Sequence, residues 1–155
     1  MAKRSMALQP LSRQHHNGLF FCLLLEKGVK KKADPILMRD FCMFFWENDL
    51  QLHFELEEKN LVALDSNAVL TTAINRMIAE HARIRYLFHQ NVQQADEQVF
   101  IQLYDLVEKH IRFEERELFP LIESVISGEE LQEIGKAFVG QTDKNCSAYP
   151  IKFWE

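Results

Sequence analysis

Two histidine–glutamate pairs are the residues of this sequence most suited to chemistry. Glu57 follows His53 by four residues, and Glu114 follows His110 by the same interval. Residues four apart lie on one face of an α-helix, so each pair can direct an imidazole nitrogen and a carboxylate oxygen toward one point. The pairs therefore indicate a metal site to which at least two helices contribute ligands.

Other histidines extend this set, because each of four predicted helices carries a histidine on or beside its apolar stripe. Imidazoles together with carboxylates suit iron, manganese or zinc. A competing interpretation is a collection of unrelated polar residues, since polar i,i+4 pairs are common on exposed helix faces. Their repeated position within apolar stripes favours a metal site, because buried imidazoles and carboxylates need a partner. The candidate ligands are His15 or His16, with His53, Glu57, His81, His110 and Glu114.

Apolar residues at helical spacing predict the elements that would position these ligands. Asp34 is an expected N-cap with Pro35 in the first turn behind it, and Ser127 is a second expected N-cap. Pro120 is expected to kink its helix or break the hydrogen-bond ladder. The predicted helices extend from about Ser12 to Glu26, from Asp34 to Leu64, from residues 65–67 to residues 90–94, from Asp96 to about residue 126, and from Ser127 to Gly140.

Short links between four long helices predict an all-α fold, namely an antiparallel, up-down-up-down four-helix bundle with a short C-terminal helix and tail. The length of 155 residues predicts a single domain over residues 1–155, with the bundle at about 11–126 and the short helix and tail at 127–155. Inner positions are predicted to include Leu23, Leu52, Val69 and Ile78.

The end of the chain has no clear helical periodicity. Its aromatic residues Tyr149, Phe153 and Trp154 are expected to fold back onto the bundle, or to serve a partner or a homodimer. Cys146 lies in this polar tail and is expected to be exposed. The remaining two cysteines, Cys22 and Cys42, lie among apolar residues, so neither a disulfide framework nor a thiolate metal site is predicted.

The composition excludes some classes of partner. The net charge of −5 and the absence of a long basic tract give no reason to expect nucleic acid or an anionic membrane surface. The apolar segment at residues 20–25 is too short to span a bilayer, and no signal peptide is evident. We therefore expect a cytoplasmic protein.

The motifs resemble those of the hemerythrin-like, or HHE cation-binding, family over about residues 11–126. The matching segments are His16-Asn-Gly-Leu-Phe20, His53-Phe-Glu-Leu-Glu57, Glu80-His81 and the most specific one, His110-Ile-Arg-Phe-Glu114-Glu-Arg-Glu-Leu-Phe-Pro120. The resemblance implies two non-haem iron ions joined by an oxygen bridge, although other divalent metals suit the same ligands. It assigns His16 and His53 to one iron, His81 and His110 to the other, and Glu57 and Glu114 to both.

The sequence departs from the oxygen-carrying hemerythrins at two positions. Those proteins have a second histidine four residues from the third-helix histidine and an aspartate in the last motif. Here Met77 and Arg85 flank His81 at that spacing, and the last carboxylate is Glu114. One ligand fewer favours binding or sensing of dioxygen, nitric oxide or peroxide, or handling of iron, over oxygen carriage alone. The alternatives are a di-iron oxidase or peroxidase, and a helical interaction module with a structural metal; a binding protein is favoured over an enzyme.

Two local choices complete the predictions. His16 is favoured over His15 as the first-helix ligand, because Leu19 and Phe20 lie one turn further along the chain. Asp49 precedes His53 by one turn and is either an acceptor for an imidazole N–H or an exposed carboxylate. The other acidic side chains near the ligands, Glu55, Glu58, Glu115 and Glu117, are predicted to form a solvated face.

Overall fold

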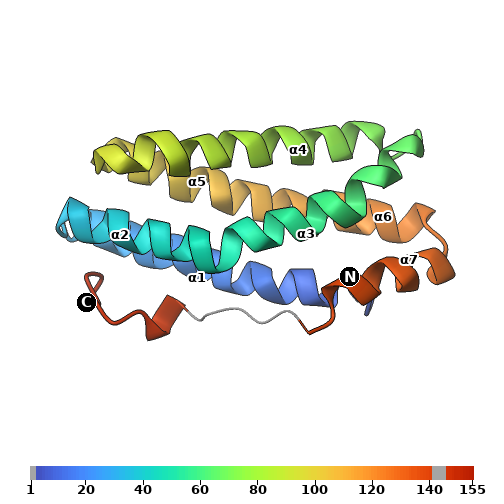
Figure 1. Cartoon of the computed structure of the whole chain (residues 1–155), viewed down its shortest axis with the longest axis horizontal. Helices are drawn as coiled ribbons and strands as arrows, with labels where there is room; N and C mark the ends of the chain where they lie inside the picture. Colours follow the sequence, from blue (N-terminus) through green and yellow to red (C-terminus); the bar gives the residue numbers. More distant parts are fainter. Residues whose placement is uncertain (1–2, 141–145) are drawn as a thin grey trace.

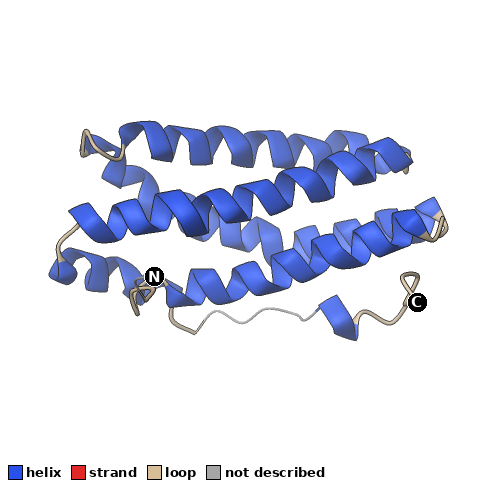
Figure 2. Cartoon of the chain, turned by 180° about the vertical axis from the view of Figure 1, so that it is seen from behind, coloured by secondary structure: helices blue, strands red, loops and turns tan. Residues whose placement is uncertain are grey.

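Four long helical segments lie side by side, and successive segments run in opposite directions (Figure 1). The computed structural model describes residues 3–140 and 146–155, whose regular elements are all helical (Figure 2). The predicted all-α class is therefore confirmed. The segments are α1 (Gln9–Lys30), α2 (Pro35–Phe45) continuing into α3 (Gln51–Leu61), α4 (Thr71–Tyr86), and α5 (Glu97–Phe113) continuing into α6 (Phe119–Val125), with the shorter α7 (Gly128–Gly135) after them.

Side-chain caps fix the start of several helices. The Ile36 N–H donates to Asp34 Oδ1 at 2.8 Å, and the Glu130 N–H donates to Ser127 Oγ at 3.2 Å, which confirms both predicted N-caps. The helix α1 begins before the expected Ser12, because Leu8 and Leu11 are fully buried and extend its apolar face. The Ser12 hydroxyl donates to Glu115 Oε2 instead of capping the helix.

Three π-helical turns interrupt the long segments at Trp46–Leu50, Leu87–Asn91 and Glu114–Leu118. Each closes with an i→i−5 hydrogen bond, as when the Phe119 N–H donates to Glu114 O. Such turns hold an extra residue and change which side chains face inward beyond them. The ladder disruption expected at Pro120 is thus a π-helical turn just before it, and the chain continues as α6 with Pro120 in the first turn, where no N–H is required.

The apolar core consists of two clusters, one toward each end of the bundle. Along each long segment, the buried histidines and glutamates fall close to the point where one cluster gives way to the other. On α4, for example, Ile74 and Met77 belong to one cluster, Ile84 belongs to the other, and the buried His81 lies between them. The two clusters therefore enclose a polar layer at the middle of the bundle.

Four residues predicted to face inward are exposed instead. Leu23 is 45% exposed because it lies one turn after the half-buried Leu19, on the side of α1. Leu52 is 42% exposed because the π-helical turn at Trp46–Leu50 rotates the residues after it, so that His53 and Phe54 point inward. Val69 is 57% exposed because it lies in the turn before α4, where helical spacing does not apply. Ile78 is 36% exposed because it follows the inward Met77 by one residue, or about 100° around the helix.

The C-terminal tail packs on the bundle, as predicted for its aromatic residues. The ring of Tyr149 lies 5.1 Å from that of Phe41, and the ring of Trp154 lies 5.7 Å from it. The expectation that Cys146 is exposed is wrong: the residue is fully buried, and its N–H donates to Asn17 Oδ1 on α1 at 3.1 Å. Among the described residues, no helix is long and apolar enough to cross a membrane.

Candidate metal centre

Six histidine and glutamate side chains meet in the polar layer. His15 comes from α1, His53 and Glu57 from α3, His81 from α4, His110 from α5, and Glu114 from the π-helical turn that follows α5. Each of the six is no more than 5% exposed. All four long segments thus contribute at least one buried polar group to one place, as the spacing of the two His–Glu pairs indicated.

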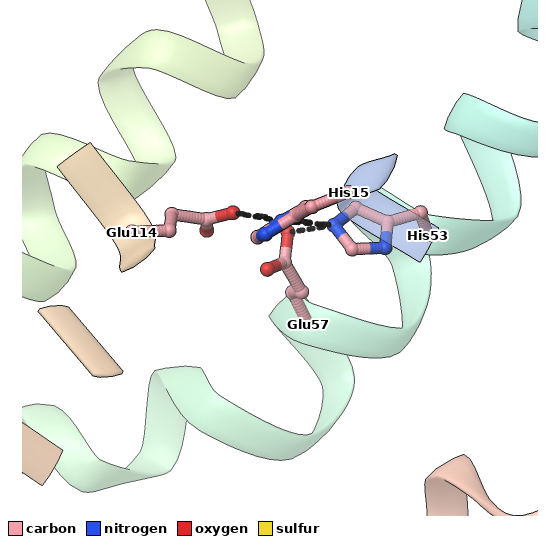
Figure 3. Close-up of side chains that lie close together, drawn as sticks. All are labelled: His15, His53, Glu57 and Glu114. Carbon is pink, nitrogen blue, oxygen red and sulfur yellow. Dashed lines mark hydrogen bonds and ion pairs between the residues drawn. The ribbon is translucent and has the colours of Figure 1, made fainter. Parts of the chain in front are cut away.

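One half of the cluster joins α1 and α3. His15 Nε2 lies 3.1 Å from His53 Nε2 and 2.9 Å from Glu114 Oε1, and His53 Nε2 lies 3.2 Å from Glu57 Oε1 (Figure 3). These four residues offer ligand atoms that all lie within 4.8 Å of one another. We call this group the α1–α3 half-site.

The other half joins α4 and α5 and uses the same two glutamates. His81 Nε2 lies 3.1 Å from His110 Nε2 and 3.2 Å from Glu57 Oε1. His110 Nε2 lies 3.4 Å from Glu114 Oε1, and the four ligand atoms again lie within 4.8 Å of one another. This α4–α5 half-site therefore shares both carboxylates with the α1–α3 half-site, an arrangement in which each glutamate can contact two cations.

The two shared carboxylates are incompletely satisfied by the protein. Both oxygens of Glu57 and Oε2 of Glu114 are buried and accept no hydrogen bond of good geometry from the described residues, although the Nε2 atoms of His53 and His81 each lie 3.2 Å from Glu57 Oε1. A buried carboxylate oxygen without a donor is costly, and a bound cation is one of the few groups that removes the cost. The residues present thus fit two metal ions held between two imidazole pairs.

Without metal, the protonation states of the histidines and glutamates in this layer depend on one another. Burial alone would lower the pKa of His53, but the nearby carboxylates of Glu57 and Glu114 outweigh it and raise that pKa to about 10. The pKa of His110 is likewise lowered by burial and raised more strongly by Glu114, again to about 10. Burial raises the pKa of Glu114, but the histidines around it, His110 first, lower it well below its ordinary value. A metal ion would replace protons on these imidazoles when it binds.

The structure brings five of the six predicted ligands together and corrects the sixth. His15 is 3% exposed and belongs to the cluster, whereas His16 is exposed and lies outside it. The inward face of α1 passes through Leu11, His15 and Gly18, which are spaced by four and three residues. The prediction relied on Leu19 and Phe20, which are only half-buried and mark the side of this helix.

Four further residues that contact the imidazoles were not predicted to do so. The outer nitrogen of His81 lies 2.7 Å from Glu58 Oε2, although Glu58 was assigned to a solvated face. Glu115, assigned to the same face, contacts His15 in a similar way. The candidate acceptor Asp49 accepts a hydrogen bond from Asn17 Nδ2. The residues that contact the imidazoles share a feature that is visible in the sequence: each is the immediate neighbour of a ligand candidate. The four are Gln14, Glu58, Glu80 and Glu115.

A small cavity adjoins the α1–α3 half-site. Its volume is about 10 Å³, and its walls include His15, His53, Gly18, Phe45 and Ile111. A Cβ at position 18 would lie 2.7 Å from Ile111 Cδ1, so a larger residue there would force the end of this side chain to shift. The space is on the scale of a single water molecule.

The comparisons with known proteins agree with this geometry. The family model of the hemerythrin HHE cation binding domain matches residues 7–122, which include all six clustered side chains. No significantly similar curated protein and no significantly similar solved structure was found.

Proposed function

The chain belongs to the hemerythrin HHE cation-binding family, and from this premise we propose that its polar layer binds two iron ions and exchanges a small ligand at them. The observation that carries the proposal is the sharing of Glu57 and Glu114 by two imidazole pairs, with three of their four oxygens accepting no hydrogen bond of good geometry from the described residues. A carboxylate has two oxygens and several lone pairs, so each glutamate can contact both ions. The proposed ligands are His15, His53, Glu57, His81, His110 and Glu114.

The donor set is compatible with iron as the resident metal. Imidazole and carboxylate donors without thiolates suit iron, manganese and zinc, and they disfavour metals that prefer sulfur. The three cysteines are buried in the apolar clusters or near the tail and are not part of the polar layer. When bound, the metal pair would supply redox chemistry and exchangeable coordination positions; the protein supplies the orientation of the ligands and the exclusion of bulk water.

The surroundings of the layer favour a small ligand. Neither residue four positions from His81 joins the cluster: Met77 packs in an apolar cluster, and Arg85 pairs with Glu58 at 2.8 Å. Two histidines and two shared glutamates leave room for an exogenous ligand at each ion. The cavity beside the α1–α3 half-site has a volume of about 10 Å³, and a second cavity of about 140 Å³, lined in part by Glu80 and His110, adjoins the α4–α5 half-site. Both are smaller than the roughly 300–1,000 Å³ of typical pockets for organic ligands. This favours dioxygen, nitric oxide or peroxide as the ligand, and a binding or sensing protein over an oxidase that acts on a large molecule.

Anaerobic addition of Fe²⁺ tests the proposal directly. We expect the purified protein to retain two irons per chain after removal of unbound metal, because each half-site holds four ligand atoms within 4.8 Å. Exposure to air should then produce an optical absorption change that metal-free protein does not show. Retention of less than one metal per chain after loading would contradict the proposal.

Gly18→Ala tests the role of the cavity. The added Cβ would meet Ile111 Cδ1 at 2.7 Å, and because both residues line the cavity, the extra methyl group should narrow it. We expect the iron-loaded variant to bind nitric oxide more slowly, with unchanged iron content, when the reaction is followed by stopped-flow absorption. Gly128→Ala is the matched control, because nothing lies within 4 Å of its added Cβ. Equal association rates in all three proteins would exclude this cavity as the ligand path.

A further inference from the structure

The outer nitrogens of the four clustered imidazoles are held by a closed ring of side chains. Each imidazole directs Nε2 to the metal layer and Nδ1 to a side chain on a neighbouring helix. Every one of these side chains is adjacent in sequence to a member of the cluster. The pairs are His53 with Gln14 at 2.6 Å, His81 with Glu58 at 2.7 Å, His110 with Glu80 at 2.8 Å, and His15 with Glu115 at 3.0 Å.

The ring follows from helix geometry. Adjacent residues on a helix point about 100° apart, so the neighbour of an inward residue points along the interface with the next helix. Gln14 on α1 thereby reaches α3, Glu58 on α3 reaches α4, and Glu80 on α4 reaches α5. Glu115 closes the circle from the π-helical turn back to α1. We call these four side chains the outer ring.

The outer ring offers different hydrogen-bond acceptors to the imidazoles of the two half-sites. Both histidines of the α4–α5 half-site donate Nδ1–H to carboxylates, namely those of Glu58 and Glu80. The α1–α3 half-site has one carboxylate, Glu115, and one neutral amide, Gln14. The asymmetry lies therefore at one residue, Gln14.

The three carboxylates are themselves fixed by arginines. Glu58 pairs with Arg85 at 2.8 Å, and Glu80 pairs with Arg76 at 2.8 Å. Arg4 contacts Glu115 at 3.1 Å, and the Ser12 hydroxyl donates to the same carboxylate at 3.0 Å. Each carboxylate is thus held in position. Because each is paired with its own arginine, the net charge of these groups is the same on both sides, and the half-sites differ in the hydrogen-bond acceptor that each imidazole meets: a carboxylate at three of them and an amide at His53.

A carboxylate that accepts the outer N–H of a metal-bound imidazole orients the ring and makes it a stronger donor to the metal than an amide does. We propose that the outer ring makes the two half-sites unequal, so that the first metal ion binds at His81 and His110 and the second binds more weakly at His15 and His53. Gln14, Glu58, Glu80 and Glu115 are positioning residues in this scheme, because they act through the imidazoles. The inference rests on the proposed function, since it requires that the layer bind two ions.

Calorimetric titration of the metal-free full chain with Zn²⁺, in competition with a chelator, separates the two binding steps. Zn²⁺ takes the same nitrogen and oxygen ligands without redox change. We expect two steps of different affinity in the unaltered protein. Glu58→Gln and Glu80→Gln should each weaken the first step about 10-fold and leave the second nearly unchanged, the lower end of the effect usual for residues that support metal ligands.

Gln14→Glu gives the opposite change and is the sharper test. It places a carboxylate at the His53 Nδ1 atom without altering side-chain length, so the second step should strengthen and approach the first. A variant that lost affinity merely because it folded poorly could not produce this gain. Circular dichroism of each metal-free variant would check that the helices are intact.

Matched controls exist on the same helix. Glu55→Gln is the control for Glu58→Gln: it removes one negative charge from α3 between His53 and Glu57, but Glu55 is exposed and not part of the outer ring. Gln51→Glu is the control for Gln14→Glu, because it adds a negative charge at an exposed position. Both controls should leave both steps unchanged. Two steps of equal affinity, or equal effects of Glu58→Gln and Glu55→Gln, would overturn the unequal half-sites while leaving the proposed function intact. Absence of any Zn²⁺ or Fe²⁺ binding by the unaltered protein would instead overturn the proposed function itself.

Discussion

Glu114→Gln is expected to abolish stable binding of two metal ions per chain. Glu114 belongs to both half-sites, and its carboxylate lies within 3.4 Å of both His15 Nε2 and His110 Nε2. The amide has the same shape but only one oxygen and no charge, so it cannot contact two cations as a carboxylate does. We expect a loss of affinity of more than about 100-fold, above the range typical of residues that merely support ligands.

The measurement is metal content after Fe²⁺ loading and gel filtration. Glu117→Gln is the control, because it makes the same change in the same π-helical turn at a side chain that is 63% exposed. Glu114→Asp keeps a carboxylate at this position and should retain metal with reduced affinity. Two irons per chain in Glu114→Gln would show that Glu114 does not hold the metal ions.

Phe54→Ala is expected to lower the free energy of unfolding by about 3–5 kcal/mol, the usual cost of truncating a buried phenylalanine. Phe54 is fully buried between the apolar core and the polar layer. Its ring stacks on His81 with 3.8 Å between ring centroids, and it meets His110 edge-on at 5.5 Å. The variant should therefore lose metal affinity at the α4–α5 half-site as well as stability, because His81 loses the surface that fixes its ring plane.

Urea unfolding of the metal-free protein gives the stability change, and Zn²⁺ titration gives the affinity change. Phe100→Ala separates the two effects. Phe100 is also fully buried in the same apolar cluster, but it precedes His110 on α5 by about 15 Å of helix. Phe100→Ala should lower the free energy of unfolding by a similar amount and leave the metal affinity unchanged. An equal loss of affinity in both variants would mean that Phe54 acts only through global stability.

Much of the fold follows from the sequence because its signals are local. Apolar residues at helical spacing predicted the long segments, and Asp34 and Ser127 fixed two of their starts through hydrogen bonds to residues only two or three positions away. The five ligand candidates His53, Glu57, His81, His110 and Glu114 were found in the same way, since the i,i+4 pairs and apolar neighbours lie within a few turns of each. The structure brings these five together, and their role as metal ligands is part of our proposal.

The predictions were wrong at positions where the rotation of a helix about its own axis decides which side chain faces inward. His15 and His16 are neighbours that differ by about 100°, and only packing of α1 against the other segments selects the inward one. Leu52 follows a π-helical turn, whose extra residue is not visible as a break in the apolar pattern. In both cases a shift of one residue exchanges an inward side chain for an outward one.

The sequence by itself determined that this chain forms helices and that imidazoles and carboxylates recur on their apolar faces. The tertiary structure alone decided that His15 rather than His16 faces inward, and that Gln14, Glu58, Glu80 and Glu115 close a ring around the imidazoles. The family resemblance implied the sharing of Glu57 and Glu114, and the structure supplies the contacts between helices that allow it. The physical reason is distance along the chain. The sharing and the ring depend on contacts between residues 23 to 100 positions apart, which no pattern within one helix specifies.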